Sequence, residues 1–305
     1  MTATRPRLTA PSAGLLDLVG ERYDGGPFAA VRPLRGGWAN DVFLLESARG
    51  EVVLRLKHPP SDPRSIAWEH ALLRRLEEPI PEVVAPIRAR NGTTFFLHGR
   101  DAVTLVPFVD GRPADPANAE HRLAAARLLG RLHAAMANVT HQERPGPEGL
   151  QQLRSLDAAS LPPEWLSQVR RLHREALDVL DRAERRPLAR GVVHGDFFRG
   201  NVLVRGDEIA GLLDWEEAHV APLVSELANA VWEFNQDGDD LDRDAGAVFA
   251  AAYREAGGPV PSSEDDLIVP LIRAKRVLEL LRAPSDRRVD WDYQAHNLRA
   301  AENLA

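Results

Sequence analysis

The sequence lacks cysteine and contains almost no lysine. None of its 305 residues is cysteine, which excludes disulfides, thiolate metal sites and thiol nucleophiles. Lysine occurs only at Lys57 and Lys275, so arginine supplies nearly all of the positive charge. No apolar run approaches the ~18 residues that a membrane-spanning helix needs, and residues 1–20 lack the pattern of a signal peptide. We therefore expect a soluble, cytoplasmic protein that does not associate with membranes.

The chain also lacks an excess of positive charge. Its formal net charge is −7, whereas nucleic acids and anionic membranes are bound by basic patches. We therefore expect no nucleic-acid partner, and a cationic or zwitterionic small molecule fits the charge better. No Walker A pattern and no Gly-x-Gly-x-x-Gly pattern is present, so neither of these phosphate-binding loops can be inferred.

The length and composition are those of a large globular chain. With 305 residues and 44% hydrophobic content, the chain exceeds the usual size of a single core. We therefore expect two lobes, in a protein that is a monomer or a homodimer.

The most informative stretch covers residues 191–216. Val192 and Val193 are typical of a short buried strand, which delivers His194 and Asp196 to a tight turn at Gly195. Two further apolar runs, 202–204 and 209–213, are separated by a Gly-Asp turn, a pattern that predicts a β-hairpin.

The predicted hairpin brings three polar side chains together. Asn201 enters one strand and Asp214 leaves the other, so both lie at the same end, beside the loop that carries Asp196. A carboxylate base with nearby oxygen ligands suits phosphoryl transfer, in which the protein positions the acceptor hydroxyl and holds Mg²⁺ against the phosphates. The interval from Asp196 to Asn201 equals that between the Asp and Asn of the protein-kinase catalytic loop.

This stretch resembles the Brenner-type motif of the aminoglycoside phosphotransferase and choline kinase superfamily, and also type II homoserine kinases. Gly195 stands where protein kinases have arginine, and Asp-Trp-Glu at 214–216 stands for their Asp-Phe-Gly. The resemblance implies an α+β, protein-kinase-like fold with two lobes. A small antiparallel-sheet lobe would cover residues 1–106, a hinge 107–113, and a mainly helical lobe 114–305.

The resemblance also implies an ATP-dependent small-molecule kinase with Mg²⁺ as its metal. Asp196 would act as the base, Asn201 and Asp214 would hold Mg²⁺, and His194 would brace the loop. A catalytically silent nucleotide-binding or small-molecule-binding protein on the same fold is the alternative. The intact Asp196, Asn201 and Asp214 argue against that alternative, because a binding protein has no need for the base.

The resemblance implies that the N-terminal lobe binds the nucleotide. Strands at 30–34 and 42–45 flank a turn with Gly36, Gly37 and Asn40, where backbone amides could approach phosphate oxygens, although an ordinary hairpin loop has the same pattern. In the run 51–57, alternation places Arg55 and Lys57 on one face.

The resemblance assigns the phosphate contact in this lobe to Arg55, with Lys57 as second choice. Glu69, on a helix predicted to start at Asp62-Pro63, would pair with this cation. Strands at 82–87, 94–97 and 103–107 would complete the sheet. At the hinge, the carbonyl of Pro107 and the N–H of Val109 would bind adenine.

The predicted helices of the second lobe carry fewer chemical signals. His133 ends a helix that starts at Asp115-Pro116, and a histidine on a core helix is more often structural than catalytic. Glu226 stands where the family usually has aspartate, which leaves its support of the catalytic loop open. The remaining helices are predicted at 162–185, 222–234, 242–256, 264–282 and 290–303, with Pro270 ending or kinking the first turns of its helix.

Acidic residues near the metal site predict the kind of acceptor. Glu216 and Glu217 follow Asp214 directly, and Trp232 precedes an acidic segment at 237–240. Together they could form an acidic, aromatic-edged entrance that favours ammonium groups, although acidic runs are usually solvated loops. We therefore expect a small-molecule acceptor that bears an amine, such as an aminoglycoside-like antibiotic, an amino alcohol or a hydroxy amino acid such as homoserine.

Overall fold

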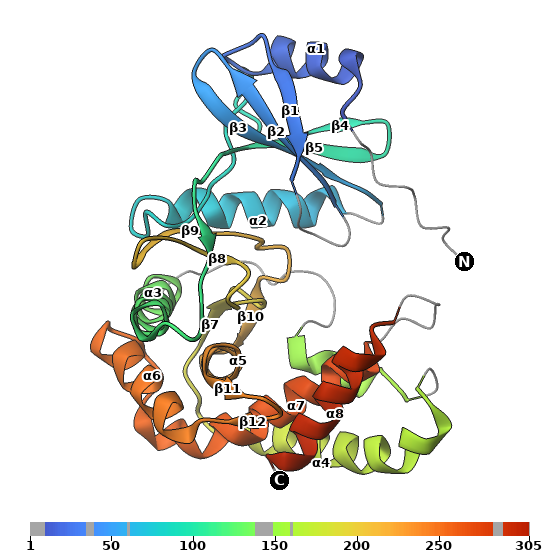
Figure 1. The fold of residues 1–305 in the computed structure, drawn as a ribbon, viewed down its shortest axis with the longest axis vertical. Coiled ribbons are helices and arrows are strands. Elements are labelled where there is room, and N and C mark those ends of the chain that lie inside the picture. The colour runs from blue at the N-terminus through green and yellow to red at the C-terminus, as the bar shows by residue number, and fades with distance from the viewer. Residues whose placement is uncertain are drawn as a thin grey trace. The chain divides into compact units, whose positions relative to one another are not determined.

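The computed structural model describes residues 10–34, 40–59, 62–137, 149–158, 161–282 and 289–304. Its contacts divide the chain into two compact units, Met1–Asp110 and Gly111–Ala305 (Figure 1). The division falls inside the segment 107–113. We describe each unit by itself.

The N-terminal unit is built on an antiparallel sheet with the strand order β1-β2-β3-β5-β4. The strands are β1 (Ala29–Pro33), β2 (Asn40–Ser47), β3 (Gly50–Lys57), β4 (Phe96–His98) and β5 (Asp101–Pro107), and the helices are α1 (Ala13–Arg22) and α2 (Pro63–Leu76). Leu15 and Val19 of α1, with Tyr23 directly after it, share a buried cluster with residues of β2, β3 and β5. An apolar face of the sheet is thereby removed from water, which is the main source of stability in such a layer.

Proline residues explain why helix α2 begins where it was predicted and why the strand predicted at 82–87 does not form. The helix α2 begins where it was predicted, because Asp62 accepts a hydrogen bond from the N–H of Arg64 at 2.9 Å and Pro63 occupies the first turn. The predicted strand at 82–87 is wrong. This segment has Pro86, which carries no N–H donor for a ladder, and it reaches the sheet through a hydrogen bond from Ile87 N–H to Leu105 O at 2.8 Å.

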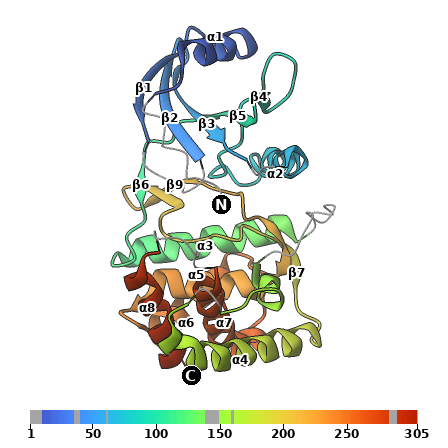
Figure 2. The same ribbon diagram turned by 90° about the vertical axis from the view of Figure 1, so that its right-hand side faces the viewer.

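The C-terminal unit is mainly helical, with α5 at its centre. Its helices are α3 (Ala119–Met136), α4 (Leu166–Glu184), α5 (Leu223–Asn235), α6 (Arg243–Glu255), α7 (Ile268–Leu281) and α8 (Trp291–Asn303). Nearly every residue of α5 is buried, since α3, α6 and α7 all contact it (Figures 1 and 2). Pro270 lies in the first turn of α7, where its missing N–H leaves no broken helical bond.

Short strands in this unit position the loops of the site. The β7 strand (Arg190–Val193) pairs antiparallel with β10 (His219–Pro222), and β8 (Val202–Arg205) pairs with β6 (Arg112–Pro113) and β9 (Glu208–Leu212). The predicted hairpin is confirmed as β8–β9, with Gly206 in the left-handed conformation at φ 62°. Across the helices that the structure describes, none is long and apolar enough to cross a membrane.

Candidate active site

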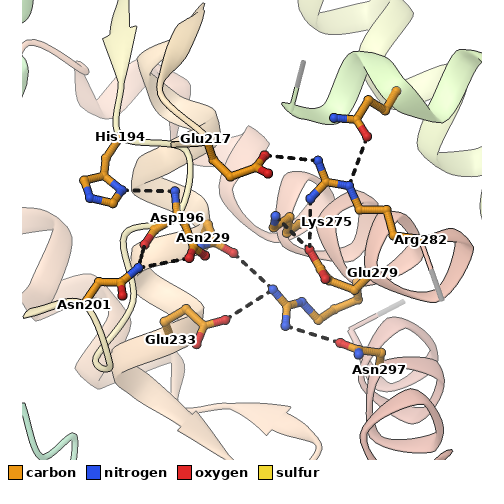
Figure 3. Close-up of polar contacts among 12 residues, drawn as sticks. His194, Asp196, Asn201, Glu217, Asn229, Glu233, Lys275, Glu279, Arg282 and Asn297 are labelled. Atoms are coloured by element: carbon orange, nitrogen blue, oxygen red, sulfur yellow. Dashed lines mark hydrogen bonds and ion pairs between the residues drawn. The ribbon is translucent and has the colours of Figure 1, made fainter. Parts of the chain in front are cut away.

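Asp196 and Asn201 are joined directly by hydrogen bonds. The Nδ2 group of Asn201 donates to the Asp196 carboxylate oxygen Oδ2 and to the Asp196 main-chain carbonyl, both at 3.0 Å (Figure 3). The loop after β7 and the start of β8 are therefore tied together, and the carboxylate of Asp196 is held in one orientation. This is the geometry that a positioned base requires.

His194 links this loop to the residue before Asp214. Its ring is buried, its Nε2 contacts Leu213 O at 2.9 Å, and its Nδ1 lies 3.2 Å from the N–H of Asp196. A carbonyl can only accept and an N–H can only donate, so the proton is on Nε2 and Nδ1 is the acceptor. His194 thus connects the ends of the two segments that carry Asp196 and Asp214.

Gly195 is required by the close approach of another segment. Its φ is 84°, and a Cβ atom there would lie 2.2 Å from the carbonyl oxygen of Glu217. No other residue fits without displacing the backbone, because L side chains rarely adopt this conformation. The departure from the protein-kinase arginine at this position therefore has a steric reason.

Asp214 lies just after β9 and has a positive φ of 61°. Burial raises the pKa of Asp196, and the carboxylate of Asp214 raises it further, while His194, Lys275 and Asn201 act in the opposite direction. Two carboxylates close enough to repel one another are a site where a cation is favourable.

The oxygen ligands here fit Mg²⁺. Because Asn201 uses its Nδ2 in the bonds to Asp196, its Oδ1 remains as an acceptor, and within the described ranges no group donates to it. Asp214 adds a carboxylate from the neighbouring segment. The described residues contain no cluster of three or more His, Asp or Glu side chains suited to a metal ion. Mg²⁺ is commonly held by one or two protein oxygens together with water and substrate phosphates, so the pair of Asn201 and Asp214 suffices.

Glu226 holds the catalytic loop through hydrogen bonds to its backbone. Its carboxylate accepts from the N–H of His194 at 2.9 Å, from the N–H of Gly195 at 2.6 Å, and from Nε2 of His133 at 2.9 Å. Burial raises the pKa of Glu226, but the hydrogen bonds that its carboxylate accepts from His133 and from the N–H of His194 act in the opposite direction, and the net pKa is lowered. The extra methylene of glutamate therefore does not prevent contact with both amides.

His133 extends this support into the core. It is buried, and its Nδ1 lies 2.9 Å from the hydroxyl of Tyr253, which donates to it. The structural reading of His133 agrees with these contacts. Tyr253 lies far away in the chain and was not anticipated, since no local pattern connects α6 with the catalytic loop.

Lys275 is a second residue that the sequence analysis did not single out as functional. It lies on α7, and its ammonium is near enough to Asp196 to lower the pKa of that carboxyl. Its rarity in a chain with only two lysines was the one available signal.

In the N-terminal unit, Glu69 forms an ion pair with Lys57, the second choice of the sequence analysis. The distance from Lys57 Nζ to Glu69 Oε2 is 3.8 Å. Burial lowers the pKa of His70 to about 4, and the cations of Arg55 and Lys57 contribute, so both cations lie near α2. The sequence analysis expected Arg55 as the partner of Glu69. The structure shows Lys57 in an ion pair with this carboxylate.

The other predicted nucleotide contacts lie at the ends of strands. Asn40 begins β2 opposite Lys57, Pro107 ends β5 and is exposed, and Val109 is half-buried. Gly36 and Gly37 lie outside the described residues.

The prediction of Trp232 at an acceptor entrance is wrong. Trp232 is fully buried in α5, with the guanidinium of Arg276 5.5 Å from its ring centre, because the face of α5 that carries it packs against α7. Glu217 is exposed but bonded to Arg282 at 3.3 Å, and Glu216 is half-buried.

The acidic groups around the loop are matched by cations. Besides the pair of Glu217 and Arg282, Glu233 lies 3.4 Å from Arg276, and Glu279 lies 2.8 Å from Lys275 (Figure 3). The surroundings of the catalytic loop are therefore of mixed charge rather than simply acidic.

A fixed carboxylate beside further side-chain oxygens, on a loop between short strands of a helical unit, is the arrangement expected of a phosphotransferase of the protein-kinase-like class. The chain belongs to the phosphotransferase enzyme family, whose family model matches residues 30–267. The structure thus confirms the α+β, protein-kinase-like fold, and the chain is a small-molecule kinase that uses a hydroxyl group as acceptor.

Curated relatives support this family at the level of sequence. A homoserine kinase of Pseudomonas aeruginosa (strain LESB58) is 35% identical over 239 residues, which cover 76% of this chain and 73% of that one. A homoserine kinase of Brucella anthropi is 28% identical over 284 residues, covering 89% and 82%.

Solved structures support the fold. A microcompartment-associated aminopropanol kinase has a TM-score of 0.76 at 17% identity, covering 96% of this chain and 95% of that one. An amicoumacin kinase in complex with AMP-PNP, Ca²⁺ and Ami has a TM-score of 0.73 at 17% identity, covering 95% and 92%.

Proposed function

We propose that this protein transfers the γ-phosphoryl group of ATP to a hydroxyl of a small acceptor that bears an amine, with L-homoserine as the first candidate. The observation that carries this proposal is the pair of hydrogen bonds from Asn201 to Asp196, which orient the base and leave Oδ1 of Asn201 for a metal ion. The names of the two curated relatives described above, both homoserine kinases, at 35% and 28% identity, support this choice of acceptor.

Each part of the site has a task in this reaction. Asp196 accepts the proton of the attacking hydroxyl, and its orientation is kept by Asn201 and by the brace through His194. Mg²⁺, held by Asn201 and Asp214, would neutralise the charge of the phosphates. Because Asp196 has a raised pKa, it is a stronger base than an ordinary aspartate when ionised.

The nucleotide is assigned to residues of the N-terminal unit. Arg55 and Lys57, with Glu69 fixing the direction of the cation, would bind the phosphates. Backbone groups at Gly36, Gly37 and Asn40 would do the same, and the carbonyl of Pro107 and N–H of Val109 would bind adenine.

The acceptor's amine is assigned to carboxylates next to the metal ligand. Glu216 is half-buried two residues after Asp214, so a positive charge beside it would gain more than at an exposed site. Glu217 already forms an ion pair with Arg282, so it contributes less to binding the amine. The net charge of −7 supports the proposal that the protein has no nucleic-acid or membrane partner. We further propose that it is a cytoplasmic monomer or homodimer.

The test is Mg²⁺-dependent release of ADP with a panel of acceptors. The panel holds L-homoserine, amino alcohols, aminoglycosides and neutral sugars, and Asp196→Asn serves as the matched variant. We expect L-homoserine to stimulate turnover, and the variant to keep its affinity for nucleotide while kcat falls by ~10²-fold or more. Nucleotide binding without turnover for any acceptor would instead support the catalytically silent alternative, and a neutral sugar as best acceptor would remove the amine requirement.

A further inference from the structure

Tyr253 of α6 lies in a region where three helices of the C-terminal unit meet, since α3, α5 and α6 all contact one another (Figure 1). Its side chain is fully buried, and two glycines make room for it. A Cβ atom at Gly130 of α3 would lie 2.2 Å from the carbonyl oxygen of Tyr253, and one at Gly258 would lie 2.3 Å from its ring. Because both segments approach so closely, the ring is held in one position.

The hydroxyl of Tyr253 faces His133 of α3. Its oxygen lies 2.9 Å from Nδ1 of His133, and the two rings meet edge to face at 82° with their centres 5.5 Å apart. The same oxygen accepts a hydrogen bond from the backbone N–H of Val260. Burial raises the pKa of the Tyr253 hydroxyl, so the group stays protonated and has one hydrogen to donate.

The proton positions in this chain of contacts follow from Glu226. Its pKa is lowered, so the carboxylate is ionised and can only accept, and Nε2 of His133, 2.9 Å away, carries the hydrogen between them. In a neutral imidazole the other nitrogen is then the acceptor, and it accepts the hydrogen of Tyr253. A ring that accepts at Nδ1 is a stronger donor at Nε2, because hydrogen bonds in a chain polarise one another.

Glu226 joins this buried hydrogen-bond chain to the catalytic loop. Its Oε2 accepts from His133 and from the N–H of His194, and its Oε1 accepts from the N–H of Gly195. The bond from His133 therefore fixes the plane of a carboxylate that holds two consecutive amides. Asp196 follows these two residues directly, so a rotation of the carboxylate would displace the base.

We propose that Tyr253 is a positioning residue, whose hydroxyl keeps Asp196 in place through the buried hydrogen-bond chain. The proposal rests on the proposed function, since it takes Asp196 as the base. The chain acts on the geometry of the loop and not on the binding of either substrate. A change at Tyr253 should therefore alter kcat rather than KM.

Tyr253→Phe is the smallest change that tests this role, since it removes the hydroxyl and keeps the ring. We expect kcat to fall by about 3- to 10-fold, the rate equivalent of one neutral hydrogen bond, while the KM values for ATP and acceptor are unchanged. A residue that only stabilises the fold would lower the free energy of unfolding and leave kcat of the folded protein as it is.

Tyr23→Phe is the matched control. Tyr23 is as fully buried as Tyr253 but belongs to the core of the N-terminal unit, so the substitution removes an equally desolvated hydroxyl from the other unit. We expect kcat of this variant to equal that of the wild type. An equal fall of kcat in both variants would overturn the proposal.

A double-mutant cycle on kcat shows whether the effect of Tyr253 passes through Glu226. If it does, Tyr253→Phe should lower kcat little further in a protein that already carries Glu226→Gln, because the loop has then lost its support. Two full effects that simply multiply would overturn the proposal.

The double variant His133→Leu/Tyr253→Phe covers the case in which Tyr253→Phe folds poorly. It replaces both partners of the hydrogen bond by apolar groups, so no ring nitrogen is left unpaired in the core. Glu226 still loses the donor at Nε2 of His133, and kcat should fall at least as far as expected for Tyr253→Phe. Wild-type kcat in this variant would overturn the proposal.

The backbone amide resonance of Gly195 separates this proposal from the proposed function. This amide lies 2.6 Å from the carboxylate, so its proton should resonate far downfield, and Tyr253→Phe should shift it while Tyr23→Phe does not. If an acceptor is phosphorylated but kcat is unchanged in Tyr253→Phe, the positioning role is wrong and the kinase assignment stands. If no acceptor is phosphorylated, the proposed function fails and the resonance decides. A shift in Tyr253→Phe alone then supports the link from Tyr253 to the loop, and an unchanged resonance overturns it.

Discussion

Replacing Glu226 by glutamine removes one acceptor atom from the support of the catalytic loop. The carboxylate receives three N–H donors, from His194, Gly195 and His133, on two oxygens. Glutamine has one oxygen and one NH₂ group. Whichever way the amide is turned, its NH₂ faces the backbone N–H of either His194 or Gly195.

The cost follows from which donors can adapt. His133 can move its proton to Nδ1 and accept from the new amide, but a backbone N–H has no alternative tautomer. One loop amide is therefore left without an acceptor, which costs ~1–3 kcal/mol. The remaining bonds also lose their charge assistance. We expect the free energy of unfolding to fall by about 3 kcal/mol, and kcat to fall by ~10-fold or more, because the same amides position Asp196.

Glu264→Gln is a matched control from the same unit. Glu264 is also buried, but it accepts a single backbone N–H, that of Ala189, at 3.3 Å, and burial raises its pKa. Glutamine keeps that bond and removes a desolvated charge, so we expect a change of less than ~0.5 kcal/mol or a slight gain. Urea unfolding followed by circular dichroism gives the free energies, and ADP release gives kcat. Equal unfolding free energies and equal turnover for the two variants would refute this reasoning.

Two further predictions concern the metal and acid stability. Asp214→Ala should weaken Mg²⁺-dependent ATP binding more than Asn201→Ala, because a carboxylate contributes charge as well as an oxygen; identical metal titrations of the two variants would contradict this. The pKa of Glu279 is about 2 in the folded chain against 4.5 ordinarily, so its ionised form contributes about 3 kcal/mol above pH 4.5 that is lost as the pH falls towards 2. Glu279→Gln should therefore flatten the decline of unfolding free energy below pH 4.5, and parallel urea-derived curves for variant and wild type would show that the ion pair with Lys275 contributes little.

Much of the catalytic loop could be predicted because its information is local. The spacing of Asp196, Asn201 and Asp214 and the apolar runs between them specify a hairpin, and a hairpin specifies which side chains meet. The β8–β9 pairing and the bonds from Asn201 to Asp196 follow from this pattern. No strand forms at 82–87 despite its apolar pattern, because Pro86 has no N–H to donate to a neighbouring strand.

The residues that were missed or misplaced depend on helix packing. Lys275, Tyr253 and Trp232 lie on α7, α6 and α5, and their surroundings are decided by which helix faces meet. Trp232 lies near the end of an apolar helix and precedes acidic residues, so its position in the sequence suggests an exposed edge. The contact of α5 with α7 instead buries it beneath Arg276. Hydrophobic periodicity predicts that a helix has a buried face but not which partner covers it.

The left-handed backbone of Asp214 is unfavourable for folding, whereas its carboxylate is useful for binding a metal ion. At φ 61° a residue other than glycine raises the energy of the chain by about 1 kcal/mol. Glycine would adopt this conformation freely but carries no oxygen to offer a metal ion. Aspartate and asparagine tolerate it best among residues with side-chain oxygens, and of these only aspartate also brings a negative charge. Glycine would therefore be the more stable residue at this position, and the carboxylate is what Asp214 supplies in exchange for the strained backbone.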